Sequence, residues 1–161
     1  MLNQNKALRR RYSPLHCGCC LVAILCLFIS VNSIAMGAEQ YAIFTLEQEF
    51  TPLSVSKARK LYRGKTKRLE GKKVELSDWP EASIERAEFY QSLLGKNTAQ
   101  MNAHWASLSF SGKARPPKEM TTADVSALVQ WMEEKSNRIG YAPLNHLPDD
   151  ATVLFVVEEV K

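Results

Sequence analysis

Ser83 and Arg86 are placed where a hydroxyl and a guanidinium could together hold an anion. In residues 78–86 a short strand ends, a proline turn follows, and Ser83 falls at or beside the start of a helix. The free N–H groups and the dipole of a helix N-terminus favour an anion, and a guanidinium one turn later would add charge-assisted hydrogen bonds. We therefore expect Ser83 and Arg86, with the flanking Ala82 and Ile84, to form an oxyanion site.

The same residues also have a purely structural interpretation. Ser83 could simply cap the helix, as serine often does, and Arg86 could pair with neighbouring acids or with solvent. Glu81, Glu85 and Glu88 lie close in sequence and oppose the binding of an anion. Spacing alone leaves both interpretations open.

No other set of residues has the spacing of a catalytic or metal site. His104 lies in a predicted helix and His146 in a loop, so they do not have the spacing of a metal-ligand pair. No Gly-Xaa-Ser-Xaa-Gly elbow and no Ser/His/Asp set is present. The sequence therefore predicts neither an enzyme, nor a metal site, nor a cofactor.

A second feature with chemical potential is the basic segment from Lys57 to Lys73. It holds nine Lys or Arg residues in 17 positions, and its one acid is Glu70. This segment could be a solvated helix end and hairpin. It could also attract an anionic partner: a lipid headgroup surface, an acidic envelope protein, or a small oxyanion.

Residues 1–38 have the three parts of a secretory signal. Four basic residues come first, the stretch from Leu21 to Val31 is almost wholly apolar, and small residues follow up to Ala38. We expect cleavage after Ala35 or Ala38 and a periplasmic location. The alternative is an uncleaved membrane anchor, because residues 17–38 carry no charge and are long enough to span a bilayer.

Without residues 1–38, the composition leads to different conclusions about cysteine chemistry and net charge. All four cysteines lie within it, so residues 39–161 contain no thiol for a disulfide, a metal site or catalysis. Four of the 21 basic residues also lie within it, which leaves 17 basic and 17 acidic residues. The net charge of +4 therefore belongs to the signal, and no nucleic-acid partner is expected.

The remaining 123 or so residues read as one domain in which strands alternate with helices. Strands are expected near residues 41–45, 73–77, 139–141 and 152–157, and helices near residues 54–63, 83–94, 97–109 and 122–135. Glycines at 64 and 95 stand where two of these helices should end. This order predicts an α/β fold with a mixed, mostly parallel sheet flanked by helices.

The order of several short motifs resembles that of a known family. The chain is similar to the short bacterial proteins related to phosphate ABC transporter substrate-binding proteins, of the type II periplasmic binding protein superfamily. The resemblance covers residues 41–157 and implies about one lobe of a two-lobed binding protein. The matching motifs are Leu61-Tyr-Arg-Gly64-Lys65, Ser83-Xaa-Xaa-Arg86-Xaa-Xaa-Phe89-Tyr90, Leu94-Gly95-Lys96, Trp105, Phe110-Ser-Gly112-Lys113, Pro116-Pro117 and Ile139-Gly140-Tyr141.

The resemblance implies an oxyanion held by an arginine and by a Ser-Gly-Thr triplet at a helix start. Ser83 matches the serine, but Ile84 and Glu85 replace the glycine and threonine, and Trp79 stands near the place of the arginine. Two functions follow as expectations. The first is an exported, non-enzymatic domain that binds phosphate or a similar oxyanion. The second is an interaction or sensor module that has lost its ligand.

Overall fold

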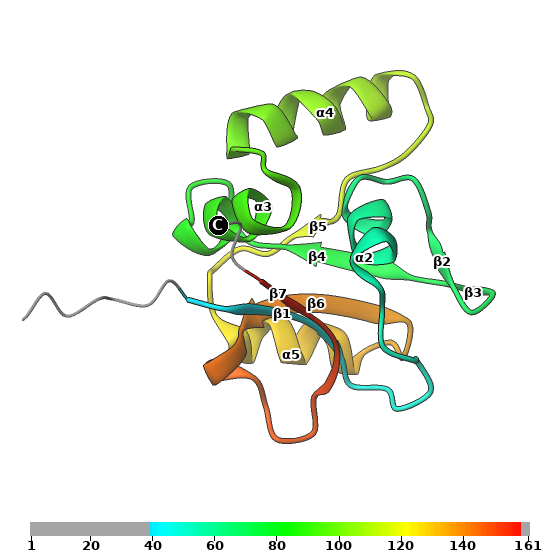
Figure 1. The fold of residues 1–161 in the computed structure, drawn as a ribbon, viewed down its shortest axis with the longest axis vertical. Helices are drawn as coiled ribbons and strands as arrows, with labels where there is room; N and C mark the ends of the chain where they lie inside the picture. The colour runs from blue at the N-terminus through cyan, green and yellow to red at the C-terminus, as the bar shows by residue number, and fades with distance from the viewer. Residues whose placement is uncertain (1–38, 159–161) are drawn as a thin grey trace, which may run out of the picture. The chain divides into compact units, whose positions relative to one another are not determined.

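The computed structural model describes residues 39–158, so the predicted signal of residues 1–38 lies outside the described residues. Strands and helices alternate along most of this domain (Figure 1). They are β1 (Tyr41–Thr45), α2 (Val55–Tyr62), β2 (Arg68–Leu69), β3 (Lys72–Lys73), β4 (Glu75–Asp78), α3 (Ile84–Leu94), α4 (Thr98–Phe110), β5 (Lys118–Glu119), α5 (Val125–Glu133), β6 (Arg138–Pro143), the 3-10 turn η2 (Leu144–His146) and β7 (Thr152–Val157).

Five strands form the central sheet in the order β5-β4-β6-β1-β7. β4 pairs in parallel with both β5 and β6, whereas β1 pairs antiparallel with both β6 and β7. β1 is therefore the one strand of this sheet that runs against the others. The prediction of a mixed, mostly parallel sheet flanked by helices is confirmed. β2 and β3 form a separate hairpin.

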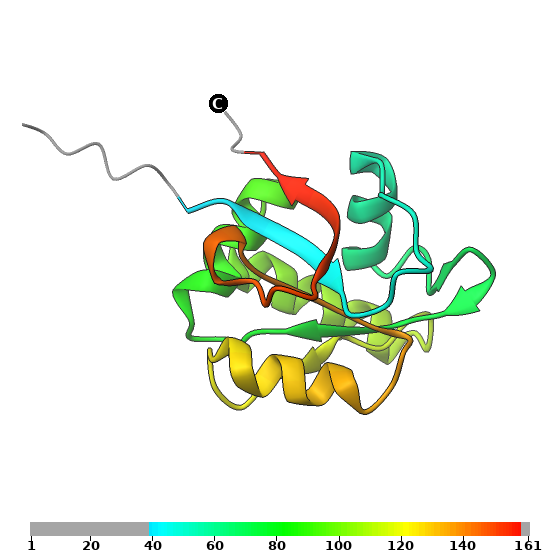
Figure 2. The same cartoon turned by 90° about the horizontal axis from the view of Figure 1, so that it is seen from below.

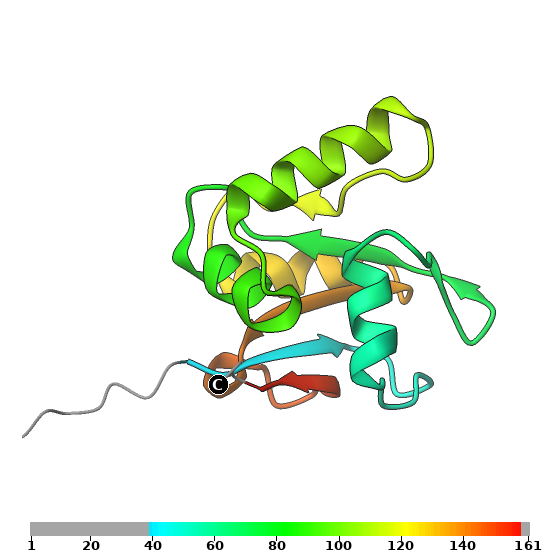
Figure 3. The same ribbon diagram turned by 45° about the horizontal axis from the view of Figure 1, so that its top comes forward.

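Helices cover both faces of the sheet, with α5 on one side and α2 and α3 on the other (Figures 2 and 3). Successive side chains of β6 point to opposite faces of the sheet, because side chains alternate along a strand. Gly140 faces α5, where an added Cβ would lie only 3.0 Å from Leu128. Tyr141 faces the other way and stacks on Phe89 of α3, with the ring centroids 3.5 Å apart.

Side-chain caps account for where the helices begin. Ser54, Ser83 and Asn97 each accept a hydrogen bond from the backbone N–H three residues later. Asp124 caps α5 by accepting from the N–H of Ser126 at 3.1 Å. Side-chain acceptors at these positions satisfy N–H groups that have no partner within the helix.

The structure differs from the predicted elements mainly in the short strands. The strand expected over residues 73–77 is two strands: Lys72–Lys73 belongs to the hairpin and Glu75–Asp78 to the sheet. The segment after Pro117, expected to be a loop, contributes β5. Helix α5 ends at Glu133 rather than at residue 135. Strands β3, β4 and β5 contain only two to four residues each, too few to show a hydrophobic period.

Candidate functional site

The four residues of the predicted anion site do gather at the start of α3. Ser83 is the N-cap, with extended backbone angles (φ −77°, ψ 146°), and its hydroxyl oxygen accepts from the N–H of Arg86 at 3.3 Å. Ala82 is exposed and the side chain of Ile84 is 66% exposed. Among residues 39–158, no acceptor lies within hydrogen-bond range of the amides of Ile84 and Glu85. Two backbone donors beside Ser83 therefore have no partner among the described residues.

The guanidinium of Arg86 points inward instead of toward solvent. The side chain is 6% exposed, and Nε lies 3.3 Å from Oδ2 of Asp78. Nη2 donates to Oδ1 of Asn102 at 2.9 Å, and Nη1 donates to the carbonyl oxygen of Trp79 at 3.4 Å. Arg86 therefore ties the start of α3 to the end of β4 and to α4.

Asp78 is the centre of this buried network, and the sequence analysis did not assign it a role. Its carboxylate accepts from the hydroxyls of Tyr141 at 2.6 Å and Tyr90 at 2.7 Å, and from the N–H of Trp79 at 3.0 Å. Burial raises the pKa of Asp78, and the charge of Arg86 and these three hydrogen bonds oppose that rise. A buried carboxylate needs hydrogen bonds and a paired cation to offset its loss of hydration, and these partners supply both.

The same burial acts on the tyrosines around Asp78. Burial first, and then the negative charge of Asp78, raises the pKa values of Tyr62, Tyr90 and Tyr141 well above 10.0. These hydroxyls therefore remain protonated at any physiological pH. They can donate to the carboxylate, but they cannot supply a base.

Glu119, the last residue of β5, brings a carboxylate to the start of α3. Its Oε1 accepts from the N–H of Glu81 at 3.1 Å, and its Oε2 lies 3.6 Å from Nη1 of Arg86. The Glu119 side chain is 54% exposed. A backbone amide and a guanidinium are the donors expected to hold an oxyanion, so a carboxylate of the chain itself already sits beside them. Glu119 is 33 residues from Arg86 in sequence, and no local pattern indicated it.

The basic segment Lys57–Lys73 does not form one surface. Arg59 donates to the carbonyl of Leu93 at 2.8 Å, and Lys72 pairs with Glu49. Lys67 and Lys73 instead line a hollow on the side of the domain. The hairpin that was expected if this basic segment has only a structural role is present as β2 and β3.

Two further properties of residues 39–158 bear on function. None of the helices described there is long and apolar enough to cross a membrane. No three His, Cys, Asp or Glu side chains in that range lie close enough together to hold a metal ion.

Comparison with known proteins shows a likeness in structure. No family model matches the sequence, and no curated protein is similar to it in sequence. The fold resembles a protein from Clostridium perfringens described as a phosphate ABC transporter substrate-binding protein, solved with bound phosphate. The TM-score is 0.54 at 12% identity, over 72% of this chain and 44% of that one.

A second solved structure gives the same result. An ABC-type phosphate transport receptor from Vibrio cholerae matches with a TM-score of 0.53 at 12% identity, over 72% of this chain and 45% of that one. The chain thus spans less than half the length of either relative. The predicted resemblance to part of a phosphate ABC transporter substrate-binding protein, about one lobe, is confirmed at the level of the fold.

Proposed function

We propose that this chain is an exported, non-enzymatic solute-binding-like protein that holds phosphate or a similar oxyanion at the start of α3. The observation that carries the proposal is the meeting of two kinds of anion donor and a cation at the carboxyl ends of β4 and β5. The amides of Ile84 and Glu85 and the Ser83 hydroxyl are the direct donors, and the buried guanidinium of Arg86 adds its positive charge. Open α/β sheets bind ligands at this end of their strands.

Each residue has a defined part in this binding. The amides of Ile84 and Glu85 would donate to two anion oxygens, and the Ser83 hydroxyl proton to a third, since its oxygen already caps the helix. The buried guanidinium of Arg86 supplies positive charge from the interior side of the start of α3. The Glu119 carboxylate, 3.6 Å from Nη1 of Arg86, competes with the anion for the charge of that guanidinium, and binding of the anion displaces this half-exposed side chain.

The displacement of Glu119 makes the proposal testable without disturbing the core. We expect phosphate to bind Glu119→Gln about tenfold more tightly than the wild type, a difference of about 1.4 kcal/mol, because the variant removes the charge that competes for Arg86. Calorimetric titration with phosphate and with sulfate measures this. Glu133→Gln, which removes an exposed acid of α5, is the matched control and should bind like the wild type. Absence of binding at millimolar phosphate in both the wild type and Glu119→Gln would exclude the site.

A second function is favoured by the inward orientation of the Arg86 guanidinium. Its donors already meet Asp78, Asn102 and the Trp79 carbonyl, and Phe110 at the end of α4 is 97% exposed. A domain that kept the fold and lost its ligand would serve as an interaction or sensor module. In that case an envelope partner captured by the wild type should be lost with Phe110→Ser and kept with Val55→Ser, which changes another exposed apolar residue.

Export rests on residues 1–38, which we propose are removed during secretion. Cleavage after Ala38 would give a protein that starts at Glu39, and cleavage after Ala35 one that starts at Met36. N-terminal sequencing of the protein recovered from the periplasm distinguishes these starts. A start at Met1 would instead support the membrane anchor.

A further inference from the structure

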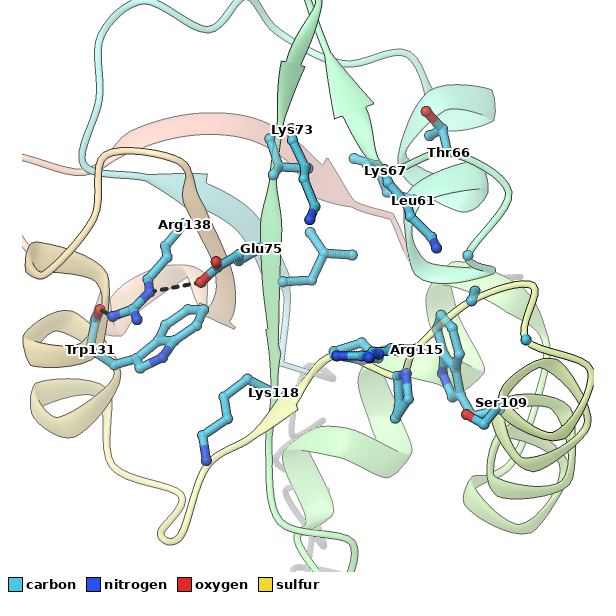
Figure 4. Close-up of a pocket in the computed structure, with 18 residues that line it drawn as sticks. Leu61, Thr66, Lys67, Lys73, Glu75, Ser109, Arg115, Lys118, Trp131 and Arg138 are labelled. Carbon is cyan, nitrogen blue, oxygen red and sulfur yellow. Dashed lines mark hydrogen bonds and ion pairs between the residues drawn. The ribbon is translucent and has the colours of Figure 1, made fainter.

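A large hollow lies at the opposite end of β4 from Ser83 and Arg86. Its volume is about 1150 Å³, and its walls come from the turn after α2, the β2–β3 hairpin, the start of β4, the α4–β5 connection and α5 (Figure 4). Binding sites for small organic molecules occupy roughly 300–1,000 Å³. A single phosphate ion would fill little of this space.

The walls of the hollow are strongly basic. Lys67, Lys73, Arg115 and Lys118 all line it; in Figure 4 Lys67 and Arg115 lie to one side of β4, and Lys118 lies to the other side with Trp131 and Arg138. Within residues 39–158 none of the four forms an ion pair. Four unpaired cations around one concavity raise the local concentration of anions.

The one acid in the lining does not cancel this charge. Glu75 lies 3.0 Å from Nζ of Lys135 and 3.3 Å from Nε of Arg138. These contacts lower the pKa of Glu75, the hydrogen bond from Lys135 most of all, so its charge is already shared with two cations. None of the four basic side chains shares its charge with an acid in residues 39–158, and Nζ of Lys67 donates to the carbonyl oxygen of Lys113 at 3.2 Å.

Aromatic rings also line the hollow. The guanidinium of Arg138 lies 4.3 Å from the ring centroid of Trp131, so that the two groups form one stacked wall. Trp105 also lines the hollow, and its buried indole N–H has no hydrogen-bond partner in the described part of the chain. Such surfaces bind flat or aliphatic groups better than they bind a bare ion.

We infer that this hollow binds a small organic polyanion: two or more phosphate or carboxylate groups carried on a ring-bearing body. The anionic groups contact Lys73, Arg115 and Lys118, and the ring packs toward Trp131. The site goes beyond the proposed function and is separate from it. The two sites are neighbours on β5, where Lys118 lines the hollow and Glu119 contacts Arg86, because successive side chains of a strand point to opposite faces.

Titration of the purified full-length protein with ATP, as a probe that combines phosphates with a ring, tests this site. We expect ATP to bind, and the triple variant Lys73→Ala, Arg115→Ala, Lys118→Ala to weaken it at least tenfold. The matched control is Lys57→Ala, Lys60→Ala, Lys96→Ala, which removes the same net charge away from the hollow and should change affinity less than threefold. All six side chains lie outside the core, so thermal unfolding should be nearly unchanged.

Three results would overturn the inference. They are no ATP binding by the wild type, an equal loss in the two triple variants, or equal affinity for ATP and inorganic triphosphate. The second would mean general attraction by net charge, and the third would mean that the ring contributes nothing. Glu119→Gln should leave ATP affinity unchanged, so this site and the phosphate site at α3 can fail independently.

Discussion

At the scale of single residues, the buried pair of Asp78 and Arg86 explains more about the start of α3 than the helix cap does. The carboxylate and the guanidinium lie 3.3 Å apart, and both side chains are almost fully buried. Tyr90, Tyr141 and Asn102 supply the remaining hydrogen bonds. Replacing both residues of such a buried ion pair lowers stability less than removing one of them, because removing one leaves a buried charge without its partner.

We therefore expect Arg86→Ala to lower the free energy of unfolding by about 3–5 kcal/mol, because it leaves the Asp78 carboxylate buried without its cation. The double variant Asp78→Asn, Arg86→Met should recover a large part of that loss. Urea unfolding measures both. Arg115→Ala, which removes an exposed arginine, is the control and should fall within about 0.5 kcal/mol of the wild type. If Arg86→Ala were as stable as this control, the pair would not hold α3 in place.

Sequence reasoning identified part of this site, and the limit has a physical cause. Ser83 and Arg86 were identified because a cap and a side chain one turn later form a local pattern. Glu119 was missed as a partner because it meets Arg86 only once β4 and β5 lie side by side, and Asp78 because its contact with Arg86 depends on the turn between β4 and α3. Long-range pairing of this kind leaves no signature in the spacing of residues.

At the scale of the elements, the contact between the end of α2 and the middle of α4 fixes the basic hollow. Gly64 follows α2 with a left-handed φ of +67°, and the ring of Trp105 packs against it. An added Cβ at Gly64 would lie 2.8 Å from two ring carbons of Trp105. The glycine is therefore required both for its backbone angle and for its lack of a side chain.

Gly95 offers a matched comparison, since it ends α3 at φ +64° with nothing within 4 Å of an added Cβ. We expect Gly95→Ala to cost about 1–2 kcal/mol of unfolding free energy from the backbone angle alone. Gly64→Ala should cost about 1–3 kcal/mol more, because Trp105 must shift. Thermal or urea unfolding of the two variants gives the difference. Equal losses would show that the contact with Trp105 is not tight.

The elements themselves were largely predictable. Helices α2, α3 and α4 begin at the caps expected for them, and β7 has the bounds that its apolar run indicated. The hairpin and β5 gave no periodic signal because each of their strands has two residues. Arg115 and Lys118 were not linked to Lys67 because about 50 residues separate them, and tertiary packing alone brings them to one hollow.

At the scale of the whole domain, an aromatic cluster joins the sheet to α2 and α3. Tyr62 meets Phe89 edge-on, with centroids 4.8 Å apart, and Tyr141 at 5.6 Å. The hydroxyl of Tyr62 is buried with no hydrogen-bond partner among the described residues. The cluster therefore contains an ionisable group that nothing in residues 39–158 compensates.

This cluster should make the domain sensitive to alkaline pH. The pKa values of Tyr62, Tyr90 and Tyr141 are raised well above the 10.0 of an unfolded chain. Their contribution to stability is therefore complete below pH 10.0 and is lost as the pH rises further, because the unfolded chain releases these protons first. We expect tyrosinate absorbance to rise together with the loss of circular dichroism.

Tyr62→Phe provides the control. It removes a buried hydroxyl without a partner, so stability at neutral pH should be equal or slightly higher, and the alkaline midpoint should move upward. Titration of all the tyrosines near pH 10 with the circular dichroism unchanged would contradict the burial of the cluster.

The position of β1 in the sheet also determines when the domain can assemble. β1 is the first strand of residues 39–158, yet both of its neighbours, β6 and β7, come from residues 138–157. The centre of the sheet therefore cannot close until nearly the whole domain has been synthesised, and contacts this distant in sequence form slowly. The export proposed above would be helped by that delay, since an unfolded chain can cross a membrane before β1 pairs with its neighbours.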